Sequence, residues 1–456
     1  MTQPDQQLRR ALTEFLADAA KISWIGPPGS ARQLADQLAA MPSARVADTI
    51  AAEAAAVNGY VVPDPTRPHR PGRPWLPGRR LSADNLTRFG LPYLVAGGHF
   101  RPTEELTDAL AGFLAGPPVQ MWRYLMLDAD VDETVTAAVA GWEMLTPGPE
   151  LLTAISDNGA RVGAHANTLL PAMYGGEVFL RRTEEGSPPT GFLFGALLEN
   201  RPYLKHWPVL LVMNLWSNHP CHAVAQHLIE PGRRVDTLYD HTYFDIVGED
   251  GDVEIPHQGF VTVTAEQAPR FSRFADAVSA LITRAGPRHG HQTQSGYARL
   301  TNSAAQFLTA TEQSVIDATT VADHDDVTLR YVVALEGLLT GGEGPGELTR
   351  KVTQRAAVLI GNDDDDRLRV EQVVKDAYAA RSHYAHGATV TKRVALDELR
   401  DVVRRVLLAQ LILGDPLISG LALSTAADRA LLSVQVREDQ VADPQRAFWD
   451  TVADNY

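Results

Sequence analysis

The residues best suited to chemistry lie in one segment near the end of a predicted helix, from Asp376 to Gly387, with the sequence DAYAARSHYAHG. In this segment Arg381 is followed by four residues and then by His386. An arginine supplies a fixed positive charge, and a histidine can gain or lose a proton near neutral pH. These two side chains are therefore suited to stabilising a phosphate and to moving protons at it.

The helix that must position Arg381 is predicted from the apolar pattern before it. Apolar residues at spacings of three and four run from Val370 to Tyr378, and Arg381 takes the next position on the same stripe. Gly387 is expected to end the helix. On an ideal helix Arg381 and His386 would lie about 140° apart. They can converge only if the helix ends between them or if a second subunit supplies half of the site.

Two preceding predicted helices also carry a charge on an apolar stripe. Glu336 lies in DVTLRYVVALEGLL, and Arg355 lies in ELTRKVTQRAAVLIG. Burial of a charge is costly unless a partner satisfies it, so these side chains are expected to face one another. Two interpretations are open. Glu336 forms a purely structural ion cluster with Arg355 and Arg381, or it orients Arg381 beside His386 at a functional site.

The order of these segments resembles the Apea-like branch of the HEPN (higher eukaryotes and prokaryotes nucleotide-binding) superfamily. The segments are VVALEGLL, the Gly-rich turn GGEGPGE, QRAAVLIG and AYAARSHYAHG, and they lie in the last third of the chain. The resemblance implies a hydrolase, a metal-independent endoribonuclease (RNase) without a cofactor, with a site composed across a homodimer. It implies that Arg381 stabilises the phosphate charge and that His386 is the general acid and base. Ser382 and Glu336 would complete the catalytic set.

RNA, either tRNA or mRNA, is the partner that this resemblance implies. Residues 367–405 hold nine Lys or Arg against five Asp or Glu and follow an acidic run at residues 363–366. We expect RNA-binding contacts from Arg355, His383, Lys392 and Arg393. The competing hypothesis is a non-catalytic HEPN module that binds a nucleotide or a partner.

The resemblance to anti-phage and abortive-infection effectors implies that such a nuclease is regulated as part of antiviral defence. We therefore expect the first two thirds of the chain to sense a trigger, either phage-derived or a nucleotide, and to restrain the nuclease.

Composition sets the broad class of the protein. The chain has 456 residues, of which 45 % are hydrophobic, enough for several sizeable cores. Its single cysteine, Cys221, cannot form an intramolecular disulfide and fits a reducing compartment. No apolar run approaches the ~18 residues needed to span a membrane. We expect a cytoplasmic protein without a membrane partner, and the net charge of −15 disfavours indiscriminate nucleic-acid binding.

The predicted fold class is α+β, with a mixed helical and β-rich N-terminal region followed by an all-α, HEPN-like helical bundle. Residues 1–85 are expected to form a helical segment, with an amphipathic helix over residues 2–20, and a Pro/Arg-rich linker. Residues 86–295 are expected to form an α+β regulatory region. Residues 296–416 are expected to form the bundle, and residues 417–456 a helix and a polar tail, partly disordered. The linker PDPTRPHRPGRPWLPGRR is either a spacer or a basic arm in which Trp75 stacks on a base.

Within the regulatory region, residues 86–160 are expected to be mainly helical and residues 161–265 to be rich in strands. GGEVFLRRTEE predicts a strand, and the continuous apolar run HWPVLLVMNLWS is interpreted as a buried strand. The segments DTLYDHTYFDIVG, DGDVEIP and GFVTVTA, with GEDGD between them, predict a hairpin.

A third alternative is a metal-dependent hydrolase in the same region. His219, Cys221, His222 and His227 lie close together in NHPCHAVAQH, and His241 and Asp245 follow. These residue types bind zinc, but their spacing matches neither a zinc ribbon nor a His-Glu-x-x-His helix. We therefore predict no metal site there and interpret these histidines as ordinary loop and core residues.

Overall fold

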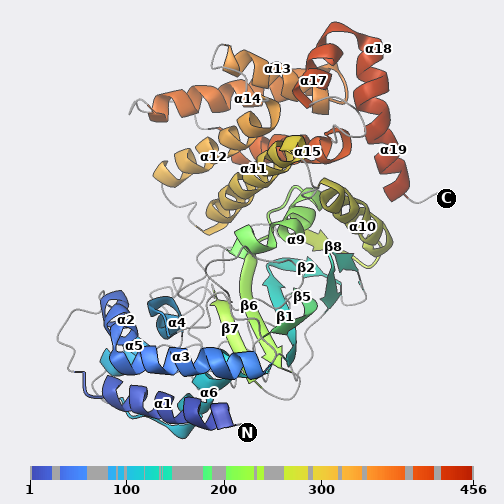
Figure 1. Ribbon diagram of the computed structural model, residues 1–456. Helices are drawn as coiled ribbons and strands as arrows, with labels where there is room; N and C mark the ends of the chain where they lie inside the picture. The colour runs from blue at the N-terminus through green and yellow to red at the C-terminus, as the bar shows by residue number, and fades with distance from the viewer. Residues whose placement is uncertain are drawn as a thin grey trace, which may run out of the picture. The chain divides into compact units, whose positions relative to one another are not determined.

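The computed structural model describes most of the chain in seventeen stretches. They are residues 3–22, 31–58, 81–88, 91–96, 100–117, 119–132, 135, 137–145, 178–186, 202–230, 234–240, 261–285, 291–316, 321–340, 347–385, 394–414 and 423–453. The Pro/Arg-rich linker, the predicted GEDGD hairpin, His241 and Asp245 lie outside these stretches. Helices dominate and strands are fewer, so the α+β class is confirmed (Figure 1).

Contacts divide the chain into two compact units, and each is built from several separate segments. The first unit comprises residues 1–126, 147–200 and 224–245, and the second comprises residues 127–146, 201–223 and 246–456. These boundaries differ from the expected ones, which divided the chain into consecutive segments that end at residues 85, 295 and 416.

The first unit begins with six helices. They are α1 (Gln3–Ala19), α2 (Ala31–Ala40), α3 (Pro42–Val57), α4 (Ala83–Arg88), α5 (Leu91–Ala96) and α6 (Glu104–Ala115). The helices α1, α3 and α6 pack on one another around a common apolar core that includes Leu12, Phe15 and Leu110 (Figure 1). Five buried alanines on α3 let its neighbours approach closely. The amphipathic helix expected over residues 2–20 is confirmed by α1.

Strands in the first unit lie in the order β5-β1-β6-β7. Their bounds are Val119–Leu127 for β1, Val178–Gly186 for β5, Ala223–Glu230 for β6 and Arg234–Asp240 for β7. β6 and β7 pair antiparallel, with a register shift between Gln226 and His227. The strand predicted from GGEVFLRRTEE is confirmed by β5. The strand β1 lies where mainly helical structure was expected.

The second unit contains two small strand pairs. β2 (Ala129–Val131) pairs in parallel with β8 (Val261–Val263), and β3 (Ala138–Val139) forms an antiparallel hairpin with β4 (Trp142–Leu145). The hairpin turns at Ala140 and Gly141, whose φ angles of 48° and 82° are those of a tight hairpin turn. The backbone N–H of Ala140 donates to Ser279 Oγ over 2.9 Å, which anchors this turn on α10 (Ala268–Ala285).

Residues 202–216 form a helix, α9 (Pro202–Trp216), so the prediction of a buried strand in HWPVLLVMNLWS was wrong. The run is apolar on every side and is buried, and such a run does not distinguish a buried strand from a buried helix by periodicity. A kink at His206, with φ −114° and ψ 19°, precedes Pro208. The side chain of Asn214 then closes the end of the helix: its amide donates to Cys221 O, and its Oδ1 accepts from Cys221 N.

The remaining helices of the second unit form the bundle. They are α11 (His291–Ile316), α12 (Val321–Leu339), α13 (Leu348–Ile360), α14 (Asp364–Ala385), α15 (Leu396–Leu413), α17 (Leu423–Leu432), α18 (Val434–Arg437) and α19 (Asp443–Val452). Contacts join α11 to α12, α13 to α14, and α12 to both α14 and α15 (Figure 1). The helical bundle expected from residue 296 onward is confirmed as a fold of helices, although α11 begins earlier.

The C-terminal tail is helical. A π-helical turn, η4 (Glu438–Ala442), connects α18 to α19, and helical backbone angles at both junctions make Val434–Val452 one continuous helix. The expectation of a polar, partly disordered end was therefore wrong for residues 434–452. Phe448 and Trp449 of α19 pack against Phe274 of α10, which explains why this end is ordered.

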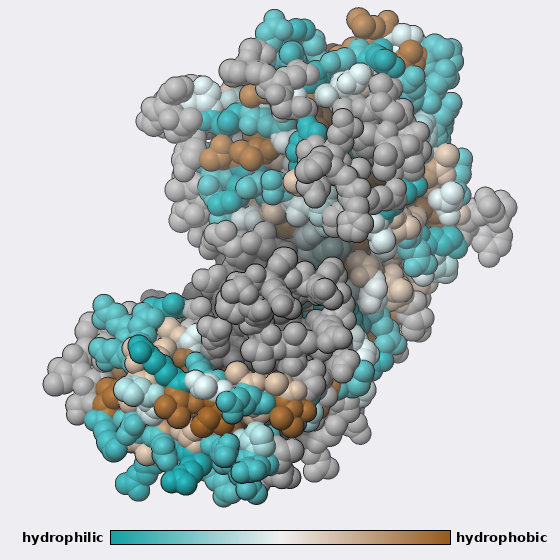
Figure 2. Space-filling view, viewed as in Figure 1, coloured by the Kyte–Doolittle hydropathy of each residue, from teal (hydrophilic) through white to brown (hydrophobic). Residues whose placement is uncertain are grey.

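The described surface is mainly hydrophilic in the view of Figure 2, with hydrophobic residues in small patches. Large exposed apolar side chains among the described residues include Leu432 and Val434, between α17 and α18. None of the helices in the described stretches combines the length and the apolar character that crossing a membrane requires.

Candidate functional site

The candidate site is built on the facing surfaces of α12 and α14. Glu336, one turn before the end of α12, directs its carboxylate at α14. Its Oε1 accepts a hydrogen bond from Arg381 Nη1 and another, of 3.0 Å, from the hydroxyl of Tyr378. One carboxylate oxygen therefore fixes two side chains that are three residues apart on α14. The predicted pairing of Glu336 with Arg381 is present in the structure.

The position of Arg381 leaves part of its guanidinium accessible. The side chain of Arg381 is 31 % exposed and that of Glu336 is 18 % exposed. The guanidinium carbon lies 5.8 Å from the centre of the Tyr378 ring, within the range of a cation–π contact. Arg381 is thus held on one side by a carboxylate and an aromatic ring and can reach an anion on its open side.

Tyr378 stays a hydrogen-bond donor in this arrangement. Burial, together with the neighbouring charge of Glu336, raises the pKa of the Tyr378 phenol well above its usual value. The phenol therefore remains protonated and donates to Glu336 at every physiological pH. Tyr378 was part of the apolar stripe in the sequence, but its hydroxyl was not predicted to take part in the site. Its spacing of three residues before Arg381 is the signal that could have indicated this.

Other predicted residues of the site lie partly outside the described chain. Ser382 is exposed and follows Arg381 directly in the last turns of α14, which extends to Ala385. His383 lies in the same helix, but its side chain is outside the described residues. His386, Lys392 and Arg393 also lie outside them. Their predicted roles therefore remain predictions.

Arg355, predicted to contact RNA, is a core residue instead. It is 1 % exposed, and its Nε and Nη2 each donate to the carboxylate of Asp428 on α17 over 2.7 Å. Its Nη1 donates to Leu339 O, at the end of α12, over 2.6 Å. A guanidinium buried in this way ties three helices together and offers no open side to a phosphate. Arg355 is thus structural, but the expectation that it faces Glu336 was wrong about the partner, because the carboxylate that holds Arg355 is that of Asp428.

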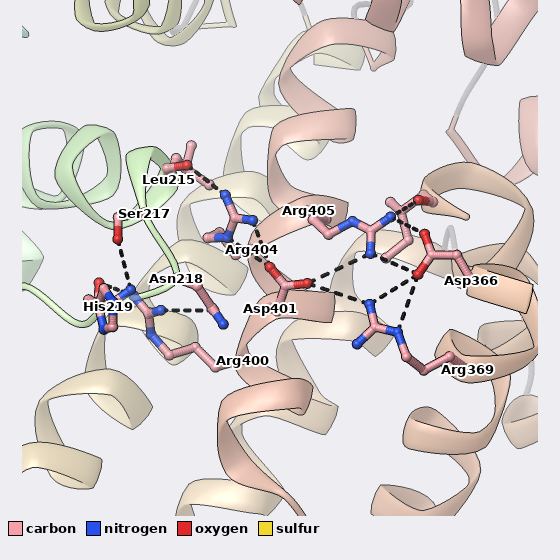
Figure 3. Close-up of polar contacts among 11 residues, drawn as sticks. Leu215, Ser217, Asn218, His219, Asp366, Arg369, Arg400, Asp401, Arg404 and Arg405 are labelled. Atoms are coloured by element: carbon pink, nitrogen blue, oxygen red, sulfur yellow. Dashed lines mark hydrogen bonds and ion pairs between the residues drawn. The ribbon is translucent and has the colours of Figure 1, made fainter. Parts of the chain in front are cut away.

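The basic region around α14 and α15 is largely neutralised by its own carboxylates. Asp366 accepts from Arg405 Nη2 over 2.6 Å and from Arg369 Nη2 over 3.0 Å (Figure 3). The donation from Arg405 lowers the pKa of Asp366 far below its usual range. Asp401 in turn accepts from Arg404 Nη2 over 2.6 Å. Asp366, in the acidic first turn of α14, therefore pairs with arginines that follow it in the chain.

Two arginines of α15 cap the end of α9. Arg400 is 3 % exposed, and its Nη2 donates to Asn214 Oδ1 over 3.0 Å. The same nitrogen donates to His219 O over 2.9 Å (Figure 3). Arg404 Nη1 donates to Leu215 O over 2.9 Å. Cations are favourable beside the free carbonyl groups at the C-terminal end of a helix, so these contacts are structural. They were not predicted, because α9 was expected to be a strand.

Of the residues considered as metal ligands, Cys221, His222 and His227 are buried and His219 is exposed, and His241 and Asp245 lie outside the described residues. Cys221 is buried, and burial raises the pKa of its thiol, which stays protonated and is a poor metal ligand or nucleophile. His227 is fully buried in β6, where burial lowers its pKa to about 3 and keeps it neutral. Within the described stretches, three or more His, Cys, Asp or Glu side chains do not gather in a way that could hold a metal ion.

Asp128 and His222 form a buried pair beside Cys221. Asp128 Oδ2 lies 3.4 Å from His222 Nδ1, and the backbone N–H of Asp128 donates to His222 O over 3.1 Å. Burial raises the pKa of Asp128 to about 7. The sequence placed His222 among the candidate ligands but did not indicate that Asp128, at the end of β1, would face it.

No protein-family model, no curated protein and no solved structure matches this chain. The resemblance to HEPN proteins therefore rests on the residues of the segments from Glu336 to Gly387.

Replacement of Arg355 by alanine should lower the free energy of unfolding by about 2–5 kcal/mol, because it leaves a cavity and removes the donor of Leu339 O and of the Asp428 carboxylate. Arg350→Ala is the matched control on the same helix: the Arg350 side chain is 58 % exposed and pairs with Glu347. Its loss should cost less than about 1 kcal/mol. Urea denaturation of both variants measures the difference. Equal losses would show that the Asp428 pair does not hold the helices together.

Asp128→Asn should remove one component of the pH dependence of stability. The pKa of Asp128 rises from 3.8 to about 7 on folding, so the folded protein binds more protons than the unfolded chain between these values. The free energy of unfolding then falls as the pH rises through this window, by up to ~1.4 kcal/mol per pH unit for one such group. Denaturant unfolding at a series of pH values should show the variant gaining stability relative to wild type towards pH 7. Parallel curves would contradict the raised pKa.

Proposed function

We propose that the helical bundle is a metal-independent HEPN endoribonuclease with Arg381 at its active site. The observation that supports this most is the arrangement of Arg381: a carboxylate and a phenol hold it, and part of its guanidinium stays open. Arg355, a purely structural arginine, differs from Arg381 because its guanidinium is buried and bonded to Asp428 and Leu339 O. The order of motifs that resembles HEPN proteins supplies the reaction class.

The proposed reaction is attack of a ribose 2′-oxygen on the adjacent phosphorus. The new P–O2′ bond forms as the P–O5′ bond breaks, which gives a 2′,3′-cyclic phosphate and a free 5′-hydroxyl. His386 takes the proton from the 2′-hydroxyl and returns a proton to the leaving O5′. Arg381 stabilises the extra negative charge on the phosphorane, because a preorganised cation acts most strongly where charge develops. Glu336 and Tyr378 keep Arg381 in place.

The remaining proposed roles follow from the position of this site. Ser382, exposed beside Arg381, would contact the phosphate, and His383, Lys392 and Arg393 would contact the RNA. A homodimer would bring a second copy of the site close to the first, as HEPN proteins do. We further propose that the first unit restrains the nuclease until it senses a trigger, in the manner of an abortive-infection effector in the cytoplasm.

The decisive experiment is incubation of the purified full-length protein with tRNA and mRNA in EDTA. Wild-type protein should cleave RNA and leave cyclic-phosphate ends, and Arg381→Ala and His386→Ala should each lower the rate by about 100-fold or more. Tyr378→Phe should have a smaller effect, because Arg381 keeps its carboxylate partner. Arg350→Ala, an exposed arginine of the same bundle, is the control and should cleave like wild type.

Two results would contradict the proposal. Equal cleavage by all variants would place the activity elsewhere. If no variant cleaves and RNA or a nucleotide still binds in a manner that depends on Arg381, the chain is the non-catalytic binding module.

A further inference from the structure

A cavity lies beside the C-terminal end of α13, at Ile360. It has a volume of about 280 Å³ and is lined by the end of α13, the start of α14, the π-helical turn η4 and α19. Its polar lining residues include Arg367, Arg437, Glu438, Gln445 and Arg446. Three arginines and one glutamate line this cavity, in a chain whose overall charge is −15.

The π-helical turn places two of these arginines on the same cavity. Arg437 and Arg446 are nine residues apart, and on an uninterrupted α-helix ~100° per residue would leave them about 180° apart. The turn η4 contains an i→i+5 hydrogen bond, from Asp443 N–H to Glu438 O. This wider turn accommodates one extra residue and so reduces the separation by roughly 100°. π-helical turns are rare and are frequently found at functional sites, so the presence of one here is consistent with a functional role for the surface that it forms.

The third arginine reaches the cavity because position 361 has no side chain. A Cβ atom on Gly361 would lie 2.2 Å from Arg367 Cγ and 2.7 Å from Ala357 O. The glycine therefore lets Arg367, in the first turn of α14, cross the end of α13. Arg367 can therefore line the cavity only because residue 361 is a glycine. A regular α-helix over residues 438–442 would likewise change the cavity lining, because it would separate Arg437 from Arg446.

Exposed carboxylates hold these guanidinium groups in the absence of a ligand. Arg367 pairs with Asp364, whose side chain is 89 % exposed. Arg446 pairs with Asp443 and, over 3.0 Å, with Glu438. Exposed ion pairs contribute little to stability, so an incoming dianion can replace them at low cost. Arg355 and Arg400 differ from these three arginines, because their side chains are almost completely buried.

We propose that this cavity binds a small organic phosphate, with its phosphate group held among Arg367, Arg437 and Arg446. Planar guanidinium groups match the oxygen atoms of a phosphate and donate to them in pairs. The volume lies near the lower end of the range for small-molecule pockets, which favours a sugar phosphate or a mononucleotide over a polymer. Trp449 provides an apolar wall for the rest of the ligand.

Calorimetric titration of the full-length protein tests this site with ribose 5-phosphate, AMP and glycerol 3-phosphate, and with ribose and adenosine as uncharged controls. At least one phosphorylated probe should bind, and the uncharged probes should not. Arg446→Gln and Arg437→Gln should each weaken that binding by about tenfold or more, since each removes a charged hydrogen-bond donor. Gly361→Ala should weaken it as well, without any change of charge.

The matched control is Arg429→Gln on α17, which removes the same charge from an exposed residue that does not line the cavity. This variant should bind the probe like wild type. The side chain of Arg446 is 61 % exposed, so its replacement should leave the fold intact, and circular dichroism verifies this. Failure of all three phosphorylated probes to bind, or equal binding by wild type and Arg446→Gln, would overturn the proposal. The RNA cleavage assay does not enter this test.

Discussion

The helical bundle depends on one constraint, which is that a guanidinium group cannot give up its charge to be buried. Wherever the bundle places an arginine inside, it must also supply acceptors, and the helices are arranged around those acceptors. Arg355 draws Asp428 and the last carbonyl group of α12 to the same point. Arg400 does the same with Asn214 and His219. Each buried arginine therefore joins helices that are far apart in the sequence, because their acceptors compensate part of the cost of burying its charge.

The acceptors around Arg381 satisfy only part of its guanidinium group, and for this reason we propose a functional role for it. Glu336 and Tyr378 occupy one side of the guanidinium, and the other side remains accessible. An arginine fixed in this way is already oriented before a substrate arrives, so binding loses little side-chain entropy. Arg446, at the cavity beside η4, differs again, because both its own side chain and its carboxylate partners are exposed.

Parts of the fold and site could be predicted from the sequence because local patterns determine them. The amphipathic pattern of residues 2–20 predicted the helix α1. The charges on the apolar stripes of the bundle predicted the pairing of Glu336 with Arg381.

The partner of Arg355 could not be predicted, since Asp428 lies 73 residues further along the chain. The helix α9 was mistaken for a strand because a run that is apolar on every side has no informative period. The strand β1 was missed because its pairing with β5 and β6 is not local. The turn η4 has no sequence signature that pattern reasoning could use.

The discontinuous course of the chain limits how the protein can be divided. The chain passes from one unit to the other after residues 126, 146, 200, 223 and 245, so neither unit is a single uninterrupted stretch of sequence. A fragment that starts at residue 296 would contain every helix from α12 onward but would lack α9. Arg400 and Arg404 would then lose the side chain of Asn214 and the carbonyl groups of Leu215 and His219. A division of the chain at residue 296 would therefore remove the acceptors that hold Arg400, a buried residue of α15, in the full chain.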